Sequence, residues 1–101
     1  MTRILSILLL TGAFAATSTA PVSGEDAPAE LLAHGCVLCH GTEGRSSGDI
    51  PALTGHSAEE ITNAMLDFRE DRRENTIMGR LAKGLTDSEI DALATLIAQW
   101  E

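Results

Sequence analysis

Two stretches of the chain carry apolar residues at helical spacing. In residues 58–68 these positions recur three and four residues apart, at Ile61, Ala64, Met65 and Phe68. In residues 87–100 the same spacing returns at Ile90, Leu93, Ala94, Ile97 and Trp100. Each stretch follows a hydroxyl residue with a glutamate three positions later, Ser57 with Glu60 and Thr86 with Glu89, the spacing of a capping box. The pattern predicts one helix after Ser57 and another from Thr86 to the C-terminus.

The remaining segments are shorter or richer in helix-breaking residues. A short helix is predicted after Asp26 or Ala27, with Pro28 in its first turn and an end near Gly35. Residues 41–55 contain four glycines and a proline, which predicts an ordered loop lying over another group. Residues 76–85 contain two glycines and no sustained helical period, so a second loop is predicted there. No segment alternates like a strand, and the expected fold is all-α, with three to four helices and long loops.

The N-terminal residues have the pattern of a secretory signal. Arg3 precedes an apolar run over residues 4–16, which is too short for a membrane span and is followed by polar residues. We expect residues 1–24 to be a signal peptide, cleaved after Ala20 or Gly24, and residues 25–101 to form one domain. The expected location is periplasmic, without stable membrane insertion after cleavage.

The size and charge of residues 25–101 limit the classes of protein to which this domain can belong. A domain of 77 residues buries barely enough apolar surface to fold, so a cofactor is expected in its core. These residues include six basic and 15 acidic side chains, and the resulting net charge of −9 argues against nucleic acid as a partner. A field of this sign speeds encounters with positively charged proteins. The alternative interpretation is that the charge only keeps the protein soluble.

The strongest chemical motif is Cys36-x-x-Cys39-His40, whose spacing is used to attach c-type haem. The two thiols add across the haem vinyl groups, and His40 is placed to reach the iron. A redox dithiol or half of a zinc site are the alternatives. The former needs a surrounding βαβ pattern and the latter a second cysteine pair, and the sequence has neither. The motif therefore predicts one covalent haem c and the transfer of single electrons.

An electron carrier also needs a sixth iron ligand, and a methionine sulfur raises the reduction potential. Met78 lies in a glycine-containing segment that is free to turn a side chain across the haem, and it is the favoured candidate. Met65 lies on the apolar stripe, where a methionine more often fills a gap in the core. His34 and His56 are expected to be solvated. The carbonyl of Pro51 could accept a hydrogen bond from the haem-ligating histidine, although a plain loop proline is an equally good interpretation.

The order of the motif, the Gly/Pro loop, the middle helix, the methionine segment and the last helix resembles the class I cytochrome c fold. The resemblance implies that Cys36 and Cys39 carry the thioethers, that His40 and Met78 are the axial pair, and that the Pro51 carbonyl accepts from His40. It also implies that the first and last helices cross. The family usually has a glycine in the first helix at this crossing, whereas this chain offers Ala29 and Ala33.

Residues 39–44 and 76–84, with the sequences CHGTEG and TIMGRLAKG, resemble the cytochrome subunit of flavocytochrome c sulfide dehydrogenase. In that family a flavin-bearing subunit oxidises sulfide and passes electrons to the haem subunit in the periplasm. The resemblance implies a single-haem electron acceptor that makes no bonds itself and delivers electrons to a downstream cytochrome or oxidase.

Two other functions remain open. The first is a freely diffusing carrier that serves a terminal oxidase or reductase. The second is a ligand-sensing or peroxide-reacting haem protein, which would need an open sixth position on the iron, and Met78 argues against that.

Overall fold

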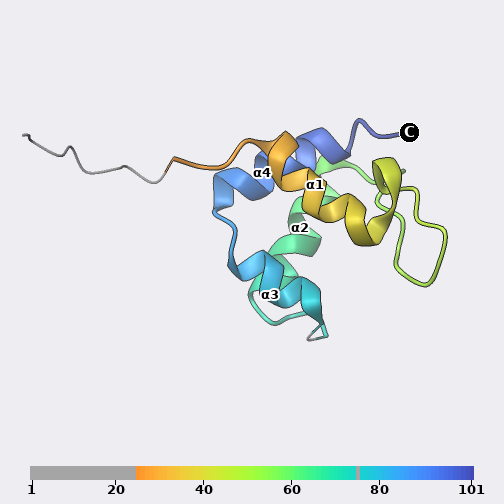
Figure 1. Ribbon diagram of the computed structural model, residues 1–101. Coiled ribbons are helices and arrows are strands. Elements are labelled where there is room, and N and C mark those ends of the chain that lie inside the picture. Colours follow the sequence, from red (N-terminus) through yellow and green to blue (C-terminus); the bar gives the residue numbers. More distant parts are fainter. Residues whose placement is uncertain (1–24, 75) are drawn as a thin grey trace, which may run out of the picture.

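The computed structural model describes residues 25–74 and 76–101 (Figure 1). Its elements are α1 (Ala29–His40), the 3₁₀ turn η1 (Thr42–Gly44), α2 (Ala58–Arg69), α3 (Ile77–Lys83) and α4 (Asp87–Ile97). No strand occurs in these two ranges, and the prediction of an all-α fold is confirmed. The predicted signal peptide, residues 1–24, lies outside the described residues.

Both predicted capping boxes are present. Ser57 Oγ accepts from the Glu60 N–H at 3.1 Å, and the Glu60 carboxylate accepts from the Ser57 N–H at 2.8 Å. Thr86 and Glu89 form the same reciprocal pair at 3.1 and 3.0 Å. Each box satisfies N–H groups that the first turn of a helix leaves without partners, and this is why α2 and α4 begin where they do.

The first helix is longer than predicted. It continues through Gly35 to His40, and Pro28 precedes it instead of lying in its first turn. Glycine inside a helix costs about 1 kcal/mol relative to alanine. Here Ala33 on one side of Gly35 is buried in the core and Cys36 on the other side packs against it, so burial outweighs that cost.

The prediction of a loop over residues 76–85 is wrong for most of that segment, because residues 77–83 form α3. Thr76 begins this helix with its hydroxyl, which accepts from the Met78 N–H at 3.2 Å. The buried residues of α3 are Gly79 and Ala82, whereas its larger apolar residues, Ile77 and Leu81, are exposed. A helix that buries its smallest side chains shows no apolar period in the sequence.

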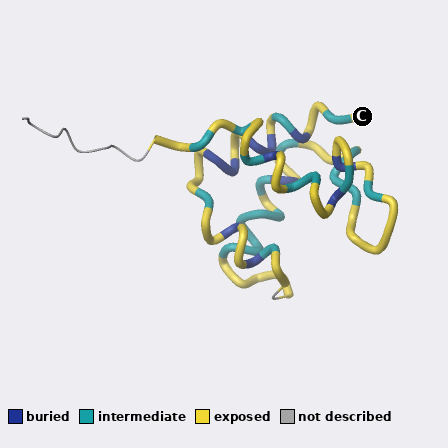
Figure 2. The backbone as a smooth tube through the Cα atoms, viewed as in Figure 1, coloured by how far each residue is buried: buried dark blue, intermediate teal, exposed yellow. Residues whose placement is uncertain are grey.

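The core lies where α1, α2 and α4 meet (Figure 2). Its buried residues are Ala33, Ile61, Leu93, Ala94 and Ile97. Three of them come from α4, whose predicted stripe is confirmed through Ile97. Trp100 lies beyond the end of α4 but packs against the same cluster. Across residues 25–74 and 76–101, no helix has the length and apolar character needed to cross a membrane.

Candidate haem site

The last turn of α1 presents the two cysteines and the histidine of the motif together. Cys36 and Cys39 are three residues apart, about one helical turn, and both are free thiols. Cys39 is exposed, whereas Cys36 is half-buried beside the core and burial raises the pKa of its thiol. One turn of helix therefore offers two unpaired sulfurs and an imidazole.

His40 is buried, with 8% of its surface exposed, and its ring has a defined orientation. Its Nδ1 lies 2.5 Å from the carbonyl oxygen of Pro51. A carbonyl oxygen can only accept a hydrogen bond, so Nδ1 must carry the proton. The neutral ring then keeps its lone pair on Nε2, which is the form of histidine that binds a metal ion.

The loop that supplies Pro51 folds back on the end of α1. The Ser46 N–H donates to the His40 carbonyl at 2.7 Å, and the Leu53 N–H donates to the Gly44 carbonyl at 2.7 Å. Gly44 has a φ of +66°, and a Cβ at this position would lie 2.7 Å from Leu53 Cβ and 2.9 Å from Trp100 Cε3. A glycine is therefore required here both by backbone conformation and by space.

Met78 lies on a different element from the rest of the predicted site. It is the second residue of α3, half-buried, and α3 packs on α2. Among the described residues, no hydrogen bond or ion pair joins α3 to α1. The structure therefore brings Cys36, Cys39, His40 and Pro51 together and places Met78 on a separate helix.

The alternative iron ligands have other surroundings. Met65 packs against the core cluster, as expected for a gap-filling methionine. His34 is exposed on α1. His56 is exposed beside Glu60, with 3.7 Å between Nδ1 and the carboxylate.

The donor set at the end of α1 fits a covalently attached haem. Two thiols that are not joined in a disulfide can form thioethers, and an imidazole with a protonated, hydrogen-bonded Nδ1 offers Nε2 to an iron. Large apolar side chains are exposed on α1, on the loop and on α3, namely Leu38, Ile50, Ile77 and Leu81. Cys36, Cys39 and His40 would hold the group.

Two residues support this site through contacts that the sequence did not predict, although Trp100 was expected on the apolar stripe of the last helix. Trp100 packs against Gly44 and so supports the loop from the far end of the chain. Arg45 in the same loop donates from Nε to the Glu101 carbonyl at 2.8 Å. A tryptophan next to the C-terminus was a visible signal, but its partner in the loop is 56 residues away in sequence.

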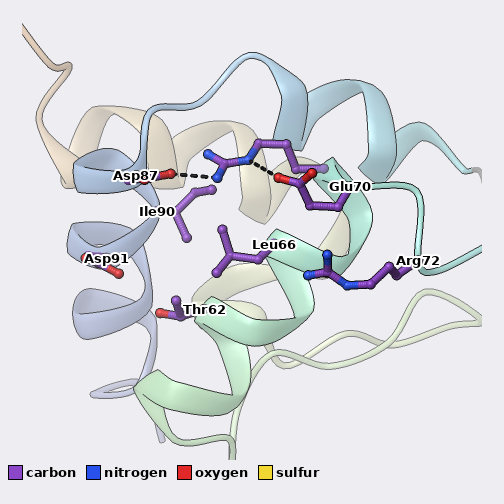
Figure 3. A pocket seen from close by; sticks show the side chains of 8 residues that line it. Thr62, Leu66, Glu70, Arg72, Asp87, Ile90 and Asp91 are labelled. Carbon is purple, nitrogen blue, oxygen red and sulfur yellow. Dashed lines mark ion pairs between the residues drawn. The ribbon is translucent and has the colours of Figure 1, made fainter.

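A groove of about 330 Å³ lies between α2 and α4 (Figure 3). Thr62, Leu66 and Ile90 line it together with charged residues, and none of the predicted haem residues is among them. The figure shows ion pairs that reach Asp87 on α4 and Glu70 just after α2. The groove is therefore separate from the candidate haem site.

The sequence also matches known proteins. The family profile described as cytochrome c matches residues 26–101. The chain is 43% identical over 84 residues to the cytochrome subunit of sulfide dehydrogenase from Chlorobaculum tepidum, a match that covers 83% of this chain and 74% of that one. It is 37% identical over 75 residues to cytochrome c-553 from Desulfomicrobium norvegicum, covering 71% of this chain and 94% of the relative. It is 39% identical over 83 residues to cytochrome c4 from Thiocapsa roseopersicina, covering 80% of this chain and 43% of the relative.

A profile match over three quarters of the chain, a relative at 43% identity and a Cys-x-x-Cys-His motif on one helical turn lead to the same conclusion. The chain belongs to the cytochrome c family, carries covalently bound haem c and transfers electrons.

Proposed function

We propose that this cytochrome accepts single electrons from a flavin-containing sulfide dehydrogenase subunit in the periplasm and passes them to a downstream cytochrome or oxidase. The observation that carries the proposal is the 43% identity, over 83% of the chain, to a protein named as the cytochrome subunit of sulfide dehydrogenase. In this role the chain itself makes and breaks no substrate bonds.

Cys36 and Cys39 would anchor the group, and His40 would bind its iron from one side. Haem, when bound, supplies the one-electron couple. The hydrogen bond from His40 Nδ1 to the Pro51 carbonyl supports this assignment, because it orients the ring and makes Nε2 a stronger donor. A ring held in this way needs little rearrangement when an electron arrives or leaves.

Met78 would bind the opposite side of the iron. Its place near the start of α3 is held locally by the Thr76 hydroxyl, which accepts from the Met78 N–H. A thioether ligand favours the reduced state and so raises the reduction potential. It also fills the sixth position, which suits a carrier better than a sensor of small molecules.

The location follows from the proposed domain boundaries. We propose that residues 1–24 form a signal peptide, removed by cleavage after residue 20 or 24, and that residues 25–101 form the mature cytochrome domain. The start of the family match at residue 26 supports this boundary. Export to an oxidising compartment is also compatible with the motif. Free thiols would pair in a disulfide there, whereas thioether bonds to haem use both sulfurs.

A freely diffusing carrier for a terminal oxidase or reductase is the second candidate. The observation that favours it is the match over 94% of the length of a cytochrome c-553, a chain close to this domain in size. The strongly acidic composition would speed its encounters with positively charged partners.

The two candidates differ in their stable partners. The protein is purified gently from its native periplasm, assayed for bound flavin, and mixed with sulfide under anaerobic conditions while the haem absorbance is followed. Rapid reduction together with a co-purifying flavoprotein is expected. Thiosulfate in place of sulfide is the control for a different sulfur compound as the electron donor. A flavin-free monomer that sulfide reduces only slowly would refute the subunit assignment and favour the diffusing carrier.

A further inference from the structure

The helix that carries Met78 buries little apolar surface. Its buried residues are Gly79 and Ala82, the two smallest side chains of α3, and α2 is the element against which it packs. Since the stabilisation from apolar burial scales with the area removed from water, these residues contribute little. Polar contacts at the ends of α3 must therefore carry a larger share of its positioning.

Arg69 provides such contacts after the C-terminal end of α3. It is the last residue of α2, and its side chain is only 23% exposed. Its guanidinium lies 2.6 Å from the carboxylate of Asp87, the first residue of α4, and donates to the Leu85 carbonyl at 3.5 Å. One side chain thus joins the end of α2 to the segment that connects α3 with α4, and Figure 3 shows the ion pair at Asp87.

We propose that Arg69 and Asp87 form a latch that positions α3 and so keeps Met78 on the haem iron. This inference rests on the assignment of Met78 as an axial ligand under the proposed function. Arg69 is a positioning residue here, because it acts through the backbone of residues 84–86. When the ion pair between Arg69 and Asp87 breaks, that connection is released. The helix α3 can then move on α2, and the Met78 sulfur can leave the iron.

The electrostatics agree with the geometry. The hydrogen bond to Asp87 raises the pKa of the Arg69 guanidinium, so the charged form is the one that the fold favours. Lys83 and Asp71 form a second ion pair at α3, with 2.5 Å between Nζ and the carboxylate, and both side chains are about half exposed. Asp87 is itself 81% exposed, so solvent and salt weaken both pairs. Arg69 is the stronger candidate because its guanidinium also donates to the Leu85 carbonyl, in the connection between α3 and α4.

The same groove offers a matched control. Arg72 pairs with Asp67 of α2 at 2.8 Å, and both residues lie on or just after α2. The Arg72→Gln variant therefore removes an arginine and an ion pair from the same region without touching the connection between α3 and α4. An Ile97→Val variant provides a second control, because it weakens the core at α4 through a residue of the α1–α2–α4 cluster.

The test measures how readily an external ligand replaces Met78. Imidazole is titrated into the oxidised holoprotein, and the shift of the main haem absorbance band reports binding. An external ligand binds only the fraction of molecules in which the sulfur has left, so a larger open fraction appears as tighter binding. Arg69→Gln and Asp87→Asn are each expected to tighten imidazole binding about two- to fivefold, the scale of one ion pair at a protein surface. The double variant should add little further, because both changes remove one interaction.

Arg72→Gln and Ile97→Val should bind imidazole as the wild type does, even if they unfold at lower temperature. Wild-type affinity in both Arg69→Gln and Asp87→Asn would overturn the latch. Equal tightening in Arg72→Gln would also overturn it, since any loss of charge would then suffice. A Met78→Ala variant separates this inference from the axial assignment. If Met78→Ala binds imidazole like the wild type, Met78 is not the ligand and both proposals fail. If it binds much more tightly while Arg69→Gln does not, the latch alone is refuted.

Discussion

Replacing Gly44 with alanine tests how the loop that supplies Pro51, residues 41–55, is held in place. Two costs apply at this position. The first is the backbone, because Gly44 has a φ of +66°, a conformation that costs a residue with a Cβ about 1–2 kcal/mol. The second is space, because the new Cβ would lie 2.7 Å from Leu53 Cβ and 2.9 Å from Trp100 Cε3. Overpacking of this kind costs about 1–3 kcal/mol.

Together these costs predict a loss of roughly 3 kcal/mol in the free energy of unfolding. In a domain of this size each kcal/mol lowers the melting temperature by about 4–8 °C, so a fall of roughly 12–24 °C is expected. Thermal unfolding of the oxidised holoprotein, followed by far-UV circular dichroism, measures it.

Two other glycines separate the two costs. Gly55 has a φ of +81°, but a Cβ at this position would have no neighbouring atom within 4 Å, so Gly55→Ala should show the backbone cost alone, about 1–2 kcal/mol. Gly48 has neither feature, so Gly48→Ala should change the stability by less than about 1 kcal/mol. If Gly44→Ala lost no more stability than Gly55→Ala, the close packing of the loop on Trp100 would not be the reason for the glycine.

Three further predictions concern the axial ligands and the N-terminal segment. Met78→Ala should lower the reduction potential and let carbon monoxide bind the reduced protein, as measured by potentiometric titration and absorbance; an unchanged potential and spectrum would contradict the assignment. Pro51→Ala keeps the carbonyl but loosens the loop, so the imidazole should become a weaker donor and the potential should rise; an equal or lower potential would mean that the loop does not need the proline. The Ser88 and Thr86 hydroxyls lower the pKa of Asp26 below its ordinary 3.8, so the stabilising effect of this carboxylate is complete above pH 3.8 and is lost as the pH falls through the lowered value. Asp26→Asn should therefore reduce the loss of stability in acid, measured as melting temperature against pH, and an unchanged acid dependence would rule out this contact as its source.

The sequence by itself determined the elements that depend on near neighbours. A capping box joins residues three positions apart, and an apolar stripe repeats within one or two turns, so α2 and α4 were predictable from residues 57–68 and 86–97. The motif at residues 36–40 is equally local, and for that reason the chemistry of the cofactor could be predicted before the fold was known.

Tertiary structure decided the features that depend on distant partners. The helix α3 exists because α2 comes close enough to bury Gly79 and Ala82, and α1 passes Gly35 because its flanking residues reach the core. From the residues alone, the hydrogen bond from His40 to the Pro51 carbonyl was no better supported than a plain loop proline, and only the resemblance favoured it. The loop that forms this bond packs against Trp100 at the other end of the chain. The contact of Arg69 with Asp87 had no sequence signal at all. Burial and space are properties of the whole fold, whereas caps and stripes are written within a few consecutive residues.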